Sequence, residues 1–148
     1  MENSNQKNKS YWDENPMTYK PFDDEFNERI LDNQEDFKYL NEFYLKENFY
    51  LNSFFYNLYN SNFLEGLNVL DIGCGWGSST FHLSKFSNKV TSIDISSVAV
   101  NGAKKNVNLN DIKNIQILEM DAEKLEFPDS SFDYLFSWGV IHHSSKPK

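Results

Sequence analysis

The sequence predicts an α/β fold in which helices flank a parallel β-sheet. Two observations support this prediction most directly. After residue 65, short apolar and β-branched runs alternate with helical or loop-like segments, and such alternation is typical of parallel sheets. The first run, residues 69–72, leads into a turn with glycine at every second position, at Gly73, Gly75 and Gly77. A buried strand, a tight turn and the start of a helix are therefore expected there.

From residue 65 onward the predicted elements follow one another at short spacing. Apolar and β-branched runs predict strands, and the periodic or Ser-capped stretches between them predict helices. The order is strand 69–72, helix 78–86, strand 90–95, a helix capped by Ser96, strand 115–120, loop 123–131 and strand 134–137. Segment 65–148 is thus predicted to be one sheet-based domain.

The first 64 residues divide into two parts. Residues 1–10 are polar and rich in Asn and Lys, which predicts a disordered tail. Segment 11–64 is predicted to be a helical extension. Near its start, Trp12 and Tyr19 bracket a Pro-containing turn. Two interpretations stay open for this turn: a lid over a ligand pocket, or an anchor that pins the N-terminus to the domain.

Residues 34–59 show helical periodicity. Asn33, with Asp36 three residues later, is a suitable N-cap. The pattern fits one long helix, or two helices with a break near Asn48. One apolar face has residues at helical spacing, namely Leu51, Phe54, Phe55 and Leu58. The aromatic side chains of this stretch either form a substrate wall or pack against the sheet, and packing is the favoured interpretation.

The glycine-rich turn indicates a ligand site. Glycine lets the backbone approach a ligand closely, and the free N–H groups at the start of the next helix point into the same space. The dinucleotide fingerprint has glycine at the sixth position of this turn, whereas this sequence has Ser78. Asp71, two residues before Gly73, would repel a pyrophosphate and attract a cation. The turn therefore favours a ligand with a cationic group.

Residues 69–77, Val-Leu-Asp-Ile-Gly-Cys-Gly-Trp-Gly, resemble the first motif of the class I S-adenosylmethionine-dependent methyltransferases. Further family motifs follow in order: residues 90–96 resemble the second strand, 120–122 the acidic turn after the third, and 132–143 the fourth strand with its exit loop. The segment Ser-Trp-Gly-Val-Ile-His-His is similar to the corresponding segment of a subgroup that acts on small molecules, the methyltransferase type 11-like domains. The resemblance covers roughly residues 66–145.

The resemblance implies a Rossmann-like sheet of seven strands, of which this sequence contains the first four. The first strand would lie beside the second and the fourth, and the ligand would bind across the carboxyl ends of the strands. Because the sequence stops at Lys148, soon after the fourth strand, we expect a C-terminally truncated fragment. The fourth strand, with Tyr134, Leu135 and Phe136, would be an open edge that promotes self-association.

The resemblance also implies how the cofactor S-adenosylmethionine is bound. The turn of Gly73, Cys74 and Gly75 would leave room for its methionine part and its ribose. Asp94 would accept hydrogen bonds from both ribose hydroxyls, and Ile95 would pack on one face of the adenine.

The remaining cofactor contacts are expected at the ends of the first, third and fourth strands. Asp71 would act near the ammonium group, and the carbonyl of Ser137 would receive that group. Asp121 would accept a hydrogen bond from the adenine amino group, while the N–H of Ala122 would face a ring nitrogen. Trp76 would either shield the cofactor or only pack.

Two histidines are candidate catalytic bases. Methyl transfer from a sulfonium depends on positioning and desolvation, and a general base is optional. His143 and, less favoured, His142 follow the fourth strand, beside the expected methyl group, and imidazole titrates near neutrality. In the other interpretation they only order the loop.

The composition of the chain disfavours several classes of binding partner. The net charge of −8 and the pI of about 4.8 disfavour a basic surface for nucleic acid or for a membrane, so neither partner is predicted. Cys74 is the only cysteine, so neither a disulfide nor a metal site is predicted. No apolar run is long enough to span a bilayer, and the N-terminus is polar. A soluble cytoplasmic protein is expected.

The leading hypothesis is a methyltransferase that uses S-adenosylmethionine and a small-molecule acceptor. A nicotinamide-dependent oxidoreductase is one alternative, which Ser78 and Asp71 argue against. A non-catalytic cofactor-binding fragment is the other, because three strands of the family fold are missing. Nothing in the sequence indicates the acceptor or the atom that receives the methyl group.

Overall fold

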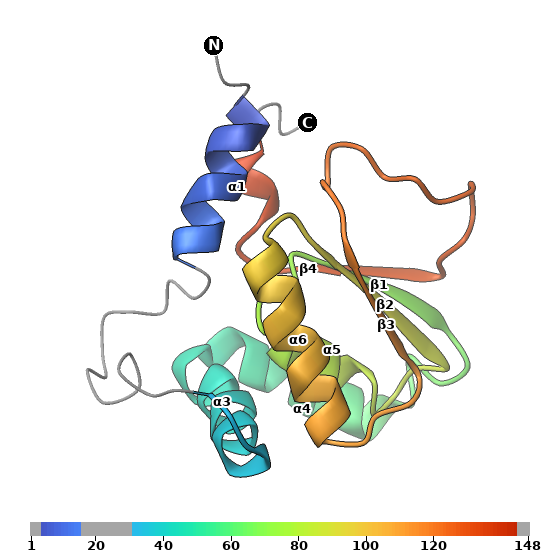
Figure 1. The fold of residues 1–148 in the computed structure, drawn as a ribbon. Helices are drawn as coiled ribbons and strands as arrows, with labels where there is room; N and C mark the ends of the chain where they lie inside the picture. Colours follow the sequence, from blue (N-terminus) through green and yellow to red (C-terminus); the bar gives the residue numbers. More distant parts are fainter. Residues whose placement is uncertain (1–3, 16–30, 145–148) are drawn as a thin grey trace.

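The computed structural model describes residues 4–15 and 31–144 (Figure 1). Its strands are β1 (Asn68–Ile72), β2 (Lys89–Asp94), β3 (Ile115–Glu119) and β4 (Tyr134–Ser137). Its helices are α1 (Ser4–Glu14), α3 (Gln34–Glu47), α4 (Phe49–Ser61), α5 (Ser78–Leu83), α6 (Ser97–Leu109) and the short 3-10 helix η1 (Ile141–His143). Of the helices in these ranges, none combines the length and the apolar character needed to span a membrane.

The strands form one parallel sheet in the order β3-β2-β1-β4. In its register, Asp71 of β1 lies beside Ser92 of β2 and Phe136 of β4. Residues Val69 to Ile72 of the inner strand β1 are buried, as expected for a parallel strand that is covered on both faces. The predicted Rossmann-like α/β fold and its strand order are confirmed.

The two faces of the sheet are covered by different elements, because successive side chains of a strand point to opposite faces. Helices α4, α5 and α6 cover one face, and their buried contacts with the strands include Phe55, Leu83, Ala103, Val90 and Ile117. The other face carries Leu70, Ile72 and Ile93, which pack against Val140 and the loop after β3. The core therefore lies on both sides of β1 and β2 and holds their carboxyl ends in place.

Helices α3 and α4 separate at Asn48, so the two-helix alternative is correct. Oδ1 of Asn33 accepts a hydrogen bond from the N–H of Asp36 (3.1 Å), and Oδ2 of Asp36 accepts one from the N–H of Asn33 (3.1 Å). This reciprocal capping box confirms the predicted start of α3. Phe54 of α4 stacks on Phe136 of β4 with 5.6 Å between ring centroids. The aromatic side chains of α4 thus pack against the sheet.

The disordered tail predicted for residues 1–10 is wrong for residues 4–10, which belong to α1. Tertiary contacts account for the difference. The Nζ of Lys9 donates a hydrogen bond to the carbonyl of Ile95 (3.0 Å), which lies 86 residues away in the sequence. A polar composition alone could not reveal such a partner. Tyr19, which was expected to bracket the Pro-containing turn, lies outside the described residues.

Strand β4 pairs only with β1 within the described part of the chain. Leu135 on this strand is 58% exposed. Self-association through this edge stays a prediction. Sedimentation velocity at increasing concentration tests it, and a single monomer boundary at every concentration would contradict it.

Candidate functional site

A cavity of about 190 Å³ lies at the carboxyl ends of β1 and β2, which is where ligands bind in open parallel sheets. Its walls come from the glycine turn, the end of β2, the loops after β3 and β4, and helices α1 and α3. Residues as distant in sequence as Asn8 and Ser144 line the same space.

The glycine turn after β1 is held against the end of β2. The N–H groups of Gly73 and Cys74 both donate to the carbonyl of Ile93, at 2.8 and 3.0 Å. Gly73 has a φ of +77°, and a Cβ at this position would lie 2.2 Å from Cγ2 of Val140. Only glycine fits there. The structure brings Gly73, Cys74 and Gly75 to the cavity.

Cys74 has the properties of a packed residue. It is buried, and burial raises the pKa of its thiol well above its usual range. A reactive thiolate is therefore disfavoured, and Cys74 is a packed residue of the turn.

Asp94 ends β2 and lines the cavity. Its Oδ2 accepts a hydrogen bond from the N–H of Gly75 and its Oδ1 accepts one from the N–H of Ser96, both at 2.9 Å. These bonds fix the orientation of the carboxylate in the cavity wall. A carboxylate has about four acceptor positions, so Asp94 keeps capacity for a ligand. Burial raises its pKa.

Asp71 does not itself line the cavity, and its expected role near a bound ammonium group stays a prediction. Its Oδ2 accepts hydrogen bonds from the hydroxyls of Ser79 (2.8 Å) and Thr80 (2.7 Å). The pleat of β1 explains this position, because it turns Asp71 toward the face that α5 covers. Asp71 therefore joins β1 to α5, the two elements that flank the glycine turn. Burial raises its pKa to about 6.

Asp71 should make stability depend on pH in a predictable direction. Its ordinary pKa is 3.8 and its pKa in the fold is about 6, so the folded state binds more protons between these values. Stability due to Asp71 should therefore fall by roughly 2 kcal/mol as the pH rises from 4 to 6.5. Burial lowers the pKa of His82 to about 4, which gives the opposite trend and masks the effect in the wild type.

The Asp71→Asn variant isolates this dependence. The wild type should lose roughly 2 kcal/mol of unfolding free energy relative to Asp71→Asn between pH 4 and 6.5. Urea denaturation at steps of pH measures the difference. Asp129→Asn, at an exposed position, is the control and should follow the wild type. If the unfolding free energies of the wild type and Asp71→Asn change in parallel with pH, the carboxyl of Asp71 has the same pKa in the folded and the unfolded state.

The loop after β3 brings further predicted residues to the site. Asp121 and Ala122 line the cavity together with Ile95 from the end of β2. Oδ1 of Asp121 accepts a hydrogen bond from the N–H of Glu123 at 2.9 Å. The same carboxylate thus orders the loop that it belongs to.

The predicted residues of the β4 region divide between the cavity and its surroundings. His143 lines the cavity, whereas Ser137 and His142 do not. Ser137 pairs with Ile72 inside the sheet, one residue before the exit loop starts. The ring of His143 contacts Trp12 edge-on, with 5.2 Å between centroids. Partial burial, followed by the neighbouring His142, lowers the pKa of His143, so its imidazole is neutral near pH 7.

Helix α3 contributes a wall that the sequence analysis assigned to packing. Its lining residues, Leu40, Phe43, Tyr44 and Glu47, recur at helical spacing. This spacing is the signal that could have identified them. Trp76 packs in the structure, and its shielding of a cofactor stays a prediction. It lines the cavity and stacks on Phe37 of α3, with 6.1 Å between centroids.

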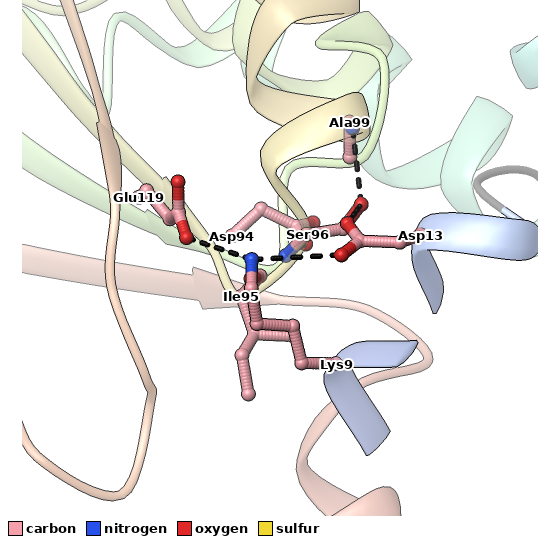
Figure 2. Close-up of polar contacts among 7 residues, drawn as sticks. All are labelled: Lys9, Asp13, Asp94, Ile95, Ser96, Ala99 and Glu119. Carbon is pink, nitrogen blue, oxygen red and sulfur yellow. Dashed lines mark hydrogen bonds and ion pairs between the residues drawn. The ribbon is translucent and has the colours of Figure 1, made fainter. Parts of the chain in front are cut away.

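Helix α1 is attached beside the cavity by the polar contacts that Figure 2 shows. The Nζ of Lys9 donates to the carbonyl of Ile95 (3.0 Å) and forms an ion pair with Glu119 of β3 (2.7 Å). The hydroxyl of Ser96 donates to Oδ1 of Asp13 (2.7 Å), and its oxygen also accepts from the N–H of Ala99 at the start of α6 (3.1 Å). These contacts, the α1 latch, hold α1 next to Asp94 and Ile95.

Comparison with known proteins gives consistent matches. Residues 69–148 match a family described as a methyltransferase domain. The crystal structure of a SAM dependent methyltransferase from Aquifex aeolicus superposes with a TM-score of 0.57 at 31% sequence identity, and the match covers 63% of this chain and 52% of that chain.

Curated enzymes with different acceptors are also similar. A fatty-acid O-methyltransferase of Mycolicibacterium smegmatis is 32% identical over 104 residues, which are 66% of this chain and 37% of that protein. A ribosomal protein L11 methyltransferase of Acetivibrio thermocellus is 36% identical over 63 residues, which are 42% of this chain and 20% of that protein. The chain thus spans less than two fifths of the length of either enzyme.

Proposed function

Because the chain belongs to the family of S-adenosylmethionine-dependent methyltransferase domains, we propose that it binds S-adenosylmethionine and transfers the methyl group to a small-molecule acceptor. The cavity at the carboxyl ends of β1 and β2 is the observation that supports this most strongly, since it combines the glycine turn with Asp94. Helices α1 and α3 contribute to its walls, which favours an acceptor small enough to enter between them.

The lining residues suit the parts of this cofactor. Asp94, with spare acceptor positions, would take the ribose hydroxyls. Ile95 would pack on the adenine, and Asp121 with the N–H of Ala122 would bind its polar edge. The described lining residues include no Lys or Arg. The nicotinamide alternative is disfavoured by Ser78, which stands where the dinucleotide fingerprint has glycine.

The cofactor supplies an electrophilic methyl group on a sulfonium. The residues of this chain would position the acceptor, exclude water and accept a proton where the acceptor loses one. A ring nitrogen of His143 is the group available for that proton, because the imidazole lines the cavity and is neutral. His143→Asn should slow methyl transfer and leave cofactor affinity unchanged. Equal turnover in an acceptor assay would remove this role.

We further propose that α1 is a lid, held by the α1 latch. Lys9→Met should raise the dissociation rate of S-adenosylhomocysteine about fivefold, because a partly exposed ion pair and its hydrogen bonds contribute about 1 kcal/mol. Stopped-flow fluorescence can follow the release, since Trp12 lies on the same helix. Lys7→Met, at an exposed position of α1, is the control. A rate like that of the wild type would show that α1 only anchors the N-terminus.

Calorimetric titration of the chain with S-adenosylhomocysteine and, separately, with NAD⁺ tests the proposed function. We expect binding of S-adenosylhomocysteine alone. Binding of NAD⁺ alone would favour the oxidoreductase, and binding of neither would contradict the cofactor site. Binding of S-adenosylmethionine with no transfer to any acceptor would support the non-catalytic alternative.

A further inference from the structure

The cavity has an aromatic side that the proposed cofactor contacts leave unused. Phe43 and Tyr44 of α3 line this side, and Trp12 of α1 and Trp138 of the loop after β4 line the same cavity. The cofactor contacts proposed above lie instead on the glycine turn, the end of β2 and the loop after β3. The α3 side is therefore available to an acceptor with an apolar or aromatic body.

The described Asp, Glu, Lys and Arg residues that line the cavity are all acidic. Within the described part of the chain, the lining carboxylates are Glu47, Asp94, Asp121 and Glu123, and no Lys or Arg lines the cavity. The lining imidazole of His143 is neutral near pH 7, since its pKa is lowered. The charged side chains that line the cavity would therefore repel an anionic acceptor and attract a cationic one.

Glu47 is the carboxylate on the acceptor side. Asp94, Asp121 and Glu123 belong to the end of β2 and the loop after β3, whereas Glu47 is the last residue of α3. The C-terminus of a helix carries a partial negative charge, which adds to the attraction for a cation. A carboxylate beside aromatic rings is a combination that binds ammonium groups, because the ring faces attract cations too.

We propose that the α3 side of the cavity takes an acceptor with an aromatic or apolar body and an ammonium group, and that Glu47 determines this preference. The inference rests on the proposed function and specifies its acceptor class. The ammonium group is a recognition group and need not be the atom that receives the methyl group. Carboxylate acceptors of similar shape are disfavoured.

Three probes of matched size test the charge preference: 2-phenylethylamine, 2-phenylethanol and phenylacetate. Each is titrated at pH 7 into chain saturated with S-adenosylhomocysteine. The amine should bind at least about tenfold tighter than the carboxylate, and the alcohol should lie between them. Equal or tighter binding of phenylacetate, or no binding of any probe, would overturn the proposal.

Variants on α3 separate a specific role of Glu47 from general acidity. Glu47→Gln should weaken binding of the amine about fivefold and leave binding of the alcohol unchanged. Glu42→Gln is the matched control, because Glu42 is exposed on the same helix and does not line the cavity. An equal loss in both variants, or no loss in Glu47→Gln, would contradict the assignment.

The titration with S-adenosylhomocysteine distinguishes the two proposals. If that ligand does not bind, the proposed function fails. If it binds and the amine is not preferred, only the acceptor class is wrong. Equal melting temperatures of Glu47→Gln and the wild type would show that the exposed substitution leaves the fold intact.

Discussion

Asp94→Asn is expected to weaken binding of S-adenosylhomocysteine about 100-fold. The carboxylate accepts the N–H groups of Gly75 and Ser96, both at 2.9 Å. An amide has one oxygen, so its NH₂ group would face one of these donors, and a charge-assisted bond to the ribose would be lost as well. Such losses amount to about 3 kcal/mol, which corresponds to about 100-fold. Calorimetric titration of variant and wild type measures the change.

Asp133→Asn provides the matched control. Oδ2 of Asp133 also accepts a backbone N–H, that of Asn68 at 2.8 Å, but Asp133 does not line the cavity. This variant loses the same charge and the same kind of bond, and it should bind like the wild type. If Asp94→Asn keeps its fold by thermal melting and binds within threefold of the wild type, Asp94 is not the ribose ligand.

Gly73→Ala is expected to abolish measurable cofactor binding and to lower the unfolding free energy by roughly 3 kcal/mol. Two costs add at this position. Its φ of +77° disfavours any side chain, and the new Cβ would lie 2.2 Å from Cγ2 of Val140. Relief of the clash would move the turn or the loop after β4, and both line the cavity. Urea denaturation and calorimetric titration measure the two effects.

Gly66→Ala separates backbone strain from the clash. Gly66 has a φ of +78°, and a Cβ there meets no atom within 4 Å. This control should lose roughly 1 kcal/mol of stability and keep its cofactor affinity. In Gly73→Ala with Val140→Ala, the smaller neighbour should restore part of the lost stability. If Gly73→Ala costs no more than Gly66→Ala, the close approach of Gly73 and Val140 is not important.

Much of the fold could be predicted because its signals are local. The capping box of Asn33 and Asp36 depends on residues three positions apart, and the strand 69–72 is a continuous apolar run broken only by Asp71. Helix α1 could not be predicted in this way. Most of its residues are polar, and the contact of Lys9 with Glu119 joins positions 110 residues apart.

The candidate site was predictable where a residue follows directly from the end of a strand. Asp94 and Asp121 reach the cavity because the carboxyl ends of parallel strands meet at one edge of the sheet. Ser137 and His142 stay outside the cavity lining, although His143 belongs to it. A shift of one residue along a 3-10 turn redirects a side chain, so the sequence does not specify which of the two histidines reaches the cavity.

The sequence by itself determined the order of the strands and helices, the glycine turn and the carboxylate at the end of β2, because these depend on neighbouring residues and on general rules of chain connection. Only the tertiary structure decided which side chains surround the cavity. It directed Asp71 to the hydroxyls of α5 and added α1 and α3 as walls. The physical reason is that such contacts depend on how distant segments pack, and packing is a property of the whole chain.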